Sequence, residues 1–497
     1  MRRVVLCMEG SRGDVQPYMA AATALQADGF SVLAMAPKDA KSMAEQQGLR
    51  FVSYPLSSRE VTTSAEVVQA VTANDFLKMS AAVNAKKNAC RREMVQILFE
   101  QLVDFKPELI ISSALSMTSC LCIGRVLRIP VLFVGLQVIV PSNHIAVLGV
   151  LPKLPGCLDM NKRAWRLILS MLMARGQRTF LDALEKLPPG SIEGSREDWE
   201  VSYQEFCDHC SCSPRYPTLF AVSSSLNGPL PPDFNDKCRL LGPIRFDAAK
   251  ELGLDFGGPE QAALENFLSA GEAPVYMGYG SLVCHSAKFM TLLSLRALKA
   301  TGRRGILVRG WAGLGLQDID SEPDAEELRS FCESKVLFMD SAPHANLFPR
   351  CSVIVHHGGA GTTYAAATSG IPSVIVPILL DQYVHAKLVN EKGIGVGLPA
   401  MRSISPHDLS EAILTCLQST SIREKAAQLG QGLEKENGAA GLLHEVKQFF
   451  EEFIDSGRYV KEKNALLARE KRHRGIRGSC LNWLYWFSSF CQRNERA

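Results

Sequence analysis

A thirty-residue stretch, residues 353–382, places the tightest limits on how this chain can fold. It reads VIVHHGGAGTTYAAATSGIPSVIVPILLDQ. The apolar run from Val353 to Val355 predicts a buried strand, a glycine-rich turn follows it, and a helix is expected to open near Thr362. A second apolar run, Ser373 to Val376, predicts another strand. The stretch therefore predicts half of a parallel βαβ unit, which belongs to the α/β class of folds.

The turn in this stretch has the composition of an anion site. Its glycines let the backbone approach a ligand closely, and the helix that follows offers the positive end of its dipole. The imidazoles and hydroxyls beside the glycines add side-chain donors, so a diphosphate is the ligand that fits best. The predicted anion site comprises His356, His357, Gly358, Gly359, Gly361, Thr362 and Thr363.

Asp381 and Gln382 follow the second strand, where ligands bind in open α/β sheets. A carboxylate beside an amide suits the hydroxyls of a sugar. The simpler alternative is a phosphate-binding loop of another α/β protein, because a glycine turn between strand and helix is common. The paired histidines, the two threonines and the Asp-Gln pair together favour a nucleotide-sugar site.

The same residues resemble the donor-nucleotide signature of the glycosyltransferases that use UDP-sugars and have the two-domain GT-B fold. The resemblance implies an α/β chain with two Rossmann-like domains facing a central cleft. It also implies that His, Gly and Ser/Thr hold the diphosphate and that the Asp-Gln pair holds the sugar. On this chain these roles fall on His357, Gly359, Thr362, Asp381 and Gln382.

The length, amino-acid composition and net charge of the chain are those of a large globular protein. The 497 residues predict two or three domains, and 46% hydrophobic and 21% charged residues with a net charge of +3 give no reason to expect nucleic-acid binding. The apolar run before Glu9 is too short for the core of a signal peptide, so a cytoplasmic protein is expected. The 15 cysteines fit reduced thiols better than a disulfide framework.

The motif CDHCSC, with Cys207, His209, Cys210 and Cys212, is the exception among the cysteines. Zinc would need four ligands at related spacing, and no second pair follows. A surface loop with free thiols is the favoured interpretation, within a segment, residues 188–216, that is expected to be a flexible insertion. No metal site is predicted.

The loop EGSRGDVQP follows the first predicted strand, Arg3 to Met8, and precedes a predicted helix from Tyr18 to Ala27. Its GSRGDVQP part resembles the opening motif of sterol glucosyltransferases and of bacterial enzymes that glycosylate antibiotics. Asp14 is the candidate general base for an inverting transfer. The alternative is that Asp14 caps the helix or pairs with Arg12. Further candidates for the donor site on this loop are Gly10, Ser11, Arg12 and Gly13.

Residues 1–226 are predicted to form the acceptor-binding domain, with helices near 76–105, 117–127 and 161–187. Many plant-type relatives use a histidine in the first loop, but no histidine occurs here before His144, so that dyad is absent. The loop after the strand near Val131 could wall a lipophilic acceptor, or it could be core. The candidate acceptor residues are Ile139, His144 and Leu148.

Proline-rich residues 227–243 predict an interdomain linker, and residues 244–436 a second Rossmann-like domain that binds the nucleotide sugar. Residues 437–457 are expected to form a helix that crosses back to the first domain. By resemblance, Ser281 contacts phosphates, Trp311 borders the base and ribose, and the turn at Pro343 and His344 recognises uracil.

The tail, residues 458–497, combines basic residues with the aromatic run CLNWLYWFSSFC. The run is too short to span a bilayer, and the mixture suits an anionic membrane surface. A strap packed on the protein is an equal alternative.

These interpretations converge on an inverting glycosyltransferase that moves a hexose, with glucose preferred, from a UDP-sugar to the hydroxyl of a sterol-like acceptor. No cofactor is required beyond the UDP-sugar itself. The family usually has Gly before the Asp-Gln pair and Phe-Trp after it, whereas this chain has Leu380, Tyr383, Val384 and His385. Two alternatives stay open: a transferase for a polyketide or other lipophilic molecule, and an inactive sterol- or lipid-binding protein of the same fold.

Overall fold

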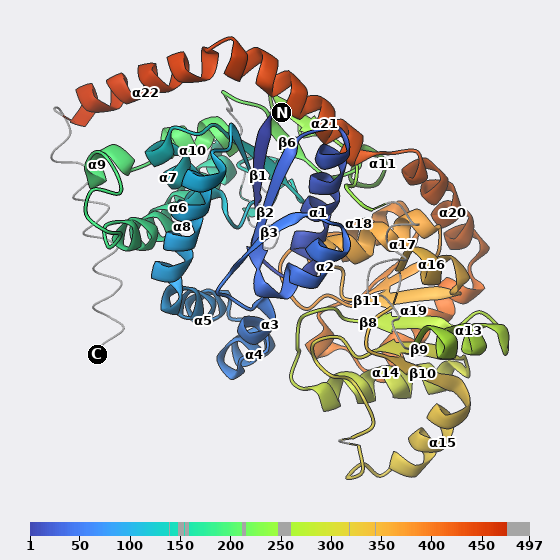
Figure 1. Cartoon of the computed structure of the whole chain (residues 1–497). Coiled ribbons are helices and arrows are strands. Elements are labelled where there is room, and N and C mark those ends of the chain that lie inside the picture. Colours follow the sequence, from blue (N-terminus) through green and yellow to red (C-terminus); the bar gives the residue numbers. More distant parts are fainter. Residues whose placement is uncertain are drawn as a thin grey trace. The chain divides into compact units, whose positions relative to one another are not determined.

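The computed structural model describes residues 1–138, 140–147, 154, 159–210, 215–246, 260–317, 319–342 and 344–474. The chain divides into two compact units, Met1–Leu443 and His444–Ala497. The first unit contains two parallel sheets (Figure 1). We call the part built on the first sheet the N-lobe and the part built on the second the C-lobe.

The N-lobe sheet has the strand order β3-β2-β1-β4-β5-β6-β7, and its described strand pairs are all parallel. Central strands are covered on both faces, which is why they read as unbroken apolar runs in the sequence. The strands are β1 (Arg3–Cys7), β2 (Ser31–Pro37), β3 (Arg50–Tyr54), β4 (Leu109–Ser112), β5 (Val131–Gly135), β6 (Thr218–Phe220) and β7 (Cys238–Leu240). Because β7 pairs with β6, the sheet extends into the residues expected to form the linker.

The helices of the N-lobe cover its sheet (Figure 1). They are α1 (Arg12–Ala27), α2 (Lys41–Gln46), α3 (Ser58–Thr62), α4 (Ala65–Thr72), α5 (Phe76–Ala89), α6 (Arg91–Phe105), α7 (Met117–Leu127), α8 (Met160–Leu184), α9 (Arg196–Trp199), α10 (Tyr203–Cys210) and α11 (Ser224–Asn227).

Two predicted helix boundaries are wrong. Helix α1 begins at Arg12 rather than near Tyr18, because Ser11 and Asp14 form a capping box that starts the helix ahead of Pro17. The single helix expected over 76–105 is interrupted at Cys90, which separates α5 from α6.

The insertion expected at 188–216 is partly helical and buried. Helix α10 buries Cys207 and Cys210, with exposed fractions of 7% and 5%, so the expected surface loop with free thiols is wrong at these positions. Cys212 lies outside the described residues. The helix is held by Arg125 of α7, whose Nη1 lies 2.5 Å from Glu205 Oε2 and whose Nε donates to the Asp198 carbonyl at 2.7 Å.

Glu205→Ala is expected to lower the free energy of unfolding by about 3 kcal/mol, because it leaves the Arg125 guanidinium buried without its carboxylate. Urea denaturation followed by circular dichroism measures the loss. The matched control is Asp104→Ala, which removes the exposed ion pair with Arg50 and should cost no more than about 1 kcal/mol. Equal losses in the two variants would contradict the interpretation.

The C-lobe sheet has the order β10-β9-β8-β11-β12-β13, again with parallel pairs throughout the described strands. Its strands are β8 (Val275–Gly278), β9 (Gly305–Val308), β10 (Val336–Met339), β11 (Val353–His356), β12 (Ser373–Ile375) and β13 (Gly395–Gly397). Its helices are α13 (Gln261–Ser269), α14 (Ala287–Thr301), α15 (Ala325–Lys335), α16 (His344–Leu347), α17 (Ala360–Ser369), α18 (Gln382–Lys392), α19 (Pro406–Gln418) and α20 (Thr420–Glu434). The βαβ unit predicted over 353–382 is therefore present as β11, α17 and β12.

Helices α21 (Gly438–Phe449) and α22 (Arg458–Arg474) follow α20. In the second unit Phe449 stacks on Phe453 at 5.0 Å between ring centroids, and Arg458 lies over the Phe453 ring. The expectation that residues 437–457 cross back to the first domain stays a prediction. Across the described helices, none is both long and apolar enough to cross a membrane.

Candidate active site

A single large cleft of about 1510 Å³ collects side chains from the carboxyl ends of both sheets. It is lined from the N-lobe by the loop after β1 and the start of α1, and from the C-lobe by the turns after β8, β9, β11 and β12. The predicted residues that line it are Gly10, Ser11, Arg12, Gly13, Asp14, Ser281, Trp311, His344, His357, Gly359, Gly361, Thr362, Asp381 and Gln382.

Some predicted residues are placed elsewhere. His144 does not line the cleft, and among the C-lobe turn residues His356, Gly358 and Thr363 lie behind its surface. Ile139, Leu148 and Pro343 lie outside the described residues, so their predicted roles stay predictions.

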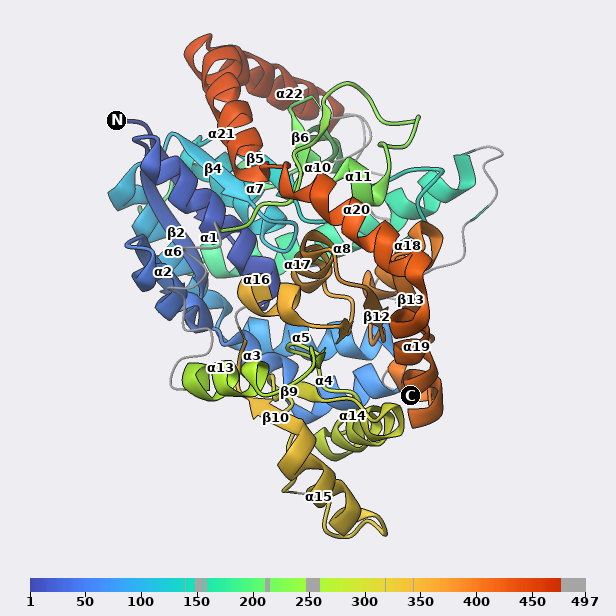
Figure 2. The same cartoon turned by 90° about the vertical axis from the view of Figure 1, so that its right-hand side faces the viewer.

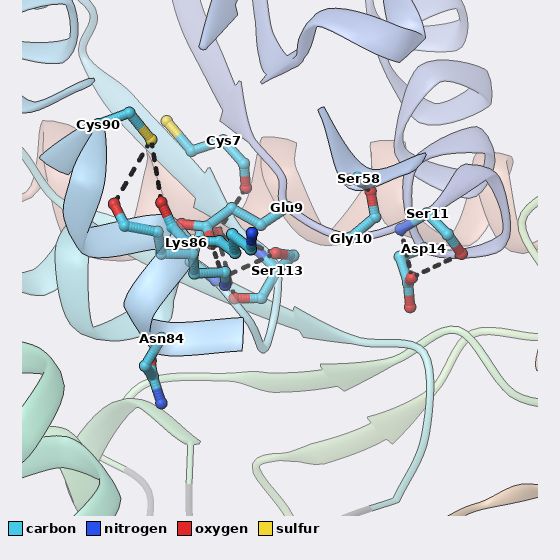
Figure 3. Close-up of polar contacts among 12 residues, drawn as sticks. Cys7, Glu9, Gly10, Ser11, Asp14, Ser58, Asn84, Lys86, Cys90 and Ser113 are labelled. Atoms are coloured by element: carbon cyan, nitrogen blue, oxygen red, sulfur yellow. Dashed lines mark hydrogen bonds and ion pairs between the residues drawn. The ribbon is translucent and has the colours of Figure 1, made fainter. Parts of the chain in front are cut away.

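Asp14 extends from the first turn of α1 toward the C-lobe side of the cleft. Its Oδ2 accepts hydrogen bonds from the Ser11 backbone N–H at 2.8 Å and from Ser11 Oγ at 3.1 Å (Figure 3). Burial raises the pKa of Asp14 to about 6; the Ser11 N–H opposes this rise, and the carboxylate of Asp381 in the C-lobe adds to it. The carboxylate therefore caps its helix, as one interpretation of the sequence expected, and also lines the cleft; its role as the general base stays a prediction.

Gly10 makes room for this carboxylate. Its φ is +113°, and a Cβ built on it would lie 2.4 Å from Asp14 Oδ2. The Gly10 carbonyl accepts a hydrogen bond from the Ser58 hydroxyl, which ties the loop to α3 (Figure 3). The loop is thus held on both sides of the turn.

His357 is clamped between two glycines of the C-lobe. A Cβ on Gly280 would lie 2.7 Å from His357 Cε1, and a Cβ on Gly359 would lie 2.5 Å from His357 Nε2. The imidazole is 8% exposed, and burial lowers its pKa to about 4. Its Nδ1 has no hydrogen-bond partner within the described part of the chain. The side chain is consequently a neutral, rigidly held imidazole at pH 7.

The neighbours of His357 support the turn from behind. His356 is fully buried, and its Nδ1 accepts a hydrogen bond from the Gly358 backbone N–H at 3.1 Å. Thr363 donates its hydroxyl to the Gly359 carbonyl at 2.9 Å. Both residues were predicted as ligand contacts, and in the structure both shape the turn instead.

Two helix N-termini meet across the cleft. Helix α17 of the C-lobe and helix α1 of the N-lobe approach each other, and a Cβ on Gly361 would lie 3.8 Å from the Gly13 Cα (Figure 2). The first N–H groups of α17 have no partners inside the helix and its end carries a partial positive charge, whereas the start of α1 is already capped by the Asp14 carboxylate. This part of the cleft therefore suits a ligand with several negative charges.

The Asp-Gln pair closes the site beyond α17. Gln382 uses its Oε1 to accept from the backbone N–H groups of Ile378 and Leu379 at 2.8 and 3.0 Å. Asp381 faces the cleft, and burial raises its pKa. Its Oδ2 lies 3.4 Å from the amide nitrogen of Gln137, which belongs to the N-lobe.

Gln137 and His385 form a bridge between the lobes that the sequence did not suggest. The Gln137 amide nitrogen lies 3.2 Å from His385 Nε2, and His385 Nδ1 lies 2.6 Å from the Gly358 carbonyl. Because a carbonyl can only accept, His385 carries its proton on Nδ1 and accepts from Gln137 at Nε2. His385 is fully buried, so this bridge fixes Asp381 and the glycine turn together.

The remaining predicted donor residues border the cleft on the other side of His357. His344 stacks on Phe348 at 4.3 Å between centroids, and its Nε2 lies 3.0 Å from the Tyr276 hydroxyl. Burial lowers the pKa of His344 to about 3, and the charge of Arg12 adds to this effect. Trp311 donates its backbone N–H to the Gly280 carbonyl at 3.2 Å, which holds the two turns side by side.

An apolar wall in the N-lobe was missed by the sequence analysis. It lies beside Asp14 and consists mostly of residues from segments that carry no motif. Only their place in the fold identifies them. The wall is made of Leu56, Val61, Val83, Leu115 and Leu136.

One charged group interrupts this wall. Lys87 of α5 lines the cleft, and its Nζ lies 2.6 Å from Glu9 Oε2, which is buried. In the described ranges no group of three or more His, Cys, Asp or Glu side chains is placed to hold a metal ion.

Glycosyltransferases are among the solved structures that share this fold. The glycotransferase of kitacinnamycin has a TM-score of 0.61 at 15% identity and covers 90% of this chain and 98% of its own. CalG4, the calicheamicin glycosyltransferase, has a TM-score of 0.58 at 16% identity and covers 91% and 99%. With two Rossmann-like lobes and the site between them, the fold is that of the GT-B glycosyltransferases.

Sequence comparison narrows the class. A family model described as erythromycin biosynthesis protein CIII-like, C-terminal domain, matches residues 319–451. Sterol 3-beta-glucosyltransferase UGT80A2 of Arabidopsis thaliana is 27% identical over 90% of this chain, and the sterol 3-beta-glucosyltransferase of Komagataella phaffii is 26% identical over 89%. The chain spans 65% of the plant relative and 34% of the yeast one. By sequence the chain is similar to these sterol 3-beta-glucosyltransferases.

Proposed function

We propose that this protein transfers a hexose, preferably glucose, from a UDP-sugar to the hydroxyl of a sterol with inversion at the anomeric carbon. The observation that carries the proposal is the pairing across one cleft of the Asp14 carboxylate with His357 and the N-terminus of α17. The names of the sequence relatives support a sterol acceptor, and the apolar wall beside Asp14 is compatible with one.

In this mechanism the acceptor hydroxyl lies between Asp14 and the anomeric carbon. Asp14 takes the hydroxyl proton as the oxygen attacks, and the bond from the anomeric carbon to the diphosphate oxygen breaks. The negative charge left on the diphosphate is met by His357 and by the free N–H groups at the start of α17. Asp381 and Gln382 hold the sugar hydroxyls, so the ring is fixed while its carbon is attacked.

The test is an assay of the purified protein with UDP-glucose and a panel of sterols, with product identified by mass spectrometry. A sterol glucoside of inverted configuration is the expected product. Absence of product from every sterol, with UDP-glucose intact, would refute the proposal.

The family model favours a polyketide-type acceptor as the second candidate, because its description names erythromycin biosynthesis. The same assay with a macrolide aglycone in place of the sterol separates the two. Product from the aglycone alone would establish the second candidate.

The pH dependence of kcat/KM is expected to report the pKa of Asp14. The carboxylate must be ionised to accept a proton, and its pKa is raised to about 6. The rate is therefore expected to be level above about pH 7 and to fall about tenfold per pH unit below pH 6. A falling limb centred near the ordinary aspartate value of 3.8 would contradict this assignment.

Gln137→Leu is expected to weaken UDP-glucose binding about tenfold while UDP binds as before. The change leaves His385 Nε2 buried without its donor and releases Asp381, whereas the hydrogen bond from His385 Nδ1 to the Gly358 carbonyl, which holds the glycine turn, is kept. Isothermal titration calorimetry with UDP and with UDP-glucose measures how differently the substitution affects the two affinities. Leu115→Ala, on the N-lobe wall, is the control and should leave both affinities unchanged. Equal weakening of UDP and UDP-glucose would show that the bridge has no special relation to the sugar.

We also propose a peripheral position at a membrane surface, since a sterol acceptor resides in lipid. The contact expected from the tail rests on its sequence alone, because residues 475–497 lie outside the described residues.

A further inference from the structure

Helix α8 carries an apolar ridge on its outer face. The helix packs against α6 and α7 on one side of the N-lobe (Figure 1). Its inner face buries Trp165, Met173 and Phe180. On the outer face Met160, Leu167 and Met171 are 41%, 52% and 61% exposed, and Leu172 beside them is 42% exposed. Met160, Leu167 and Met171 follow one another at spacings of seven and four residues, so by helix geometry they share one face and form an exposed apolar strip along it.

Arginines flank this strip. Three exposed arginines of the helix lie on or beside the outer face by helix geometry, namely Arg163, Arg175 and Arg178. The one acidic residue of the helix, Asp182, lies in its last turn, where Arg196 pairs with it at 2.8 Å. An apolar strip bordered by arginines, with no acid between them, is the pattern of a helix that lies in the interface of an anionic bilayer.

We propose that the outer face of α8, defined by Met160, Leu167, Met171 and the flanking Arg163, Arg175 and Arg178, docks on an anionic lipid membrane. The apolar side chains enter the boundary between headgroups and acyl chains, and the guanidinium groups meet lipid phosphates and carboxylates. This face differs from the tail, and the proposal does not depend on the transferase activity.

The positive charge on the outer face of α8 favours an anionic membrane over two other possible binding partners of this face. A second copy of the chain docked symmetrically would bring the same arginines against each other. Residues 475–497 of the tail carry Arg477, Arg493 and Arg496 against the single Glu495, so they have the same sign as the helix. An anionic membrane is the occupant whose charge is opposite.

The test is co-sedimentation of the full-length protein with vesicles of phosphatidylcholine, with and without phosphatidylserine. Wild-type protein is expected to bind the phosphatidylserine vesicles. The double variant Leu167→Glu with Met171→Glu should bind at least about tenfold more weakly. Arg163→Gln with Arg175→Gln should lower binding to the anionic vesicles about thirtyfold, and binding to neutral vesicles much less.

Two controls keep the result specific. Leu77→Glu places the same change on α5 at a residue that is 79% exposed, and it should bind vesicles as wild type does. Trp483→Ser with Trp486→Ser tests the tail; if only this variant loses binding, the proposal is overturned in favour of the tail. It is also overturned if wild type binds no vesicles, or if the α8 variants bind as wild type.

Self-association is tested in the same preparations. Analytical ultracentrifugation without lipid should give one molar mass for wild type and for the α8 variants. A wild-type dimer that the Leu167→Glu and Met171→Glu changes convert to monomer would assign the face to a second copy and overturn the lipid proposal. Circular dichroism confirms that each variant is folded.

Discussion

Asp14→Asn is expected to lower kcat by about a hundredfold to ten-thousandfold, the range over which a general base accelerates such transfers. Asparagine has the size and shape of aspartate, and its side-chain oxygen can still accept from the Ser11 N–H that now binds Asp14 Oδ2. The helix start and the loop therefore survive, and what is lost is the ability to take a proton.

The measurement combines steady-state kinetics with titration of UDP. Because UDP is held by the C-lobe in the proposed complex, its affinity should be unchanged in the Asp14→Asn variant. Gln26→Ala, near the far end of α1, controls for effects of altering the helix and should keep full activity. Wild-type turnover by Asp14→Asn, or a parallel loss of UDP binding, would leave the proposed reaction without its base.

The elements that position this site could be predicted from the sequence because their signals are local. The strands β1, β11 and β12 fall within one residue of the predicted ranges, since each is an apolar run bounded by polar or turn residues. The glycine turn and the Asp-Gln pair lie in one contiguous stretch, so that stretch alone identified His357, Gly359, Gly361, Thr362, Asp381 and Gln382 as residues of the cleft.

The residues that the sequence analysis missed or misplaced depend on packing between distant segments. Leu56, Val83 and Leu115 become a wall only because three separate segments meet beside Asp14. Helix α10 reads as a polar insertion, and its burial depends on the ion pair that Glu205 makes with α7, 80 residues away. Neither the apolar wall nor the burial of α10 is announced by a periodic pattern or a motif in the sequence.

The departure from the family pattern after the Asp-Gln pair has a structural role. His385 stands where the resemblance gave no expectation, and it is fully buried between the Gly358 carbonyl and Gln137. The departure concerns the contact between the lobes, while Asp381 and Gln382, which were predicted to bind the donor sugar, line the cleft. Its effect is therefore expected on the fit of the sugar rather than on the fold.

His357→Ala is expected to weaken UDP binding by about tenfold to a hundredfold. A hydrogen bond from a neutral donor to a charged acceptor contributes about 1.5–3 kcal/mol, and in the proposed complex His357 donates to the diphosphate. His357→Gln supplies a neutral donor of similar length and should recover part of the affinity. Isothermal titration of UDP measures both variants, and circular dichroism verifies their folding.

Gly359→Ala tests the same contact without removing the imidazole. The φ of Gly359 is −61°, which any residue adopts, so the only conflict is the added Cβ at 2.5 Å from His357 Nε2. The ring must move, and the UDP affinity should fall nearly as far as in His357→Ala. In the double variant the methyl group meets no imidazole, so its affinity should equal that of His357→Ala alone. A double variant much weaker than either single one would mean that Gly359 acts on the backbone N–H groups of α17 and not through the histidine.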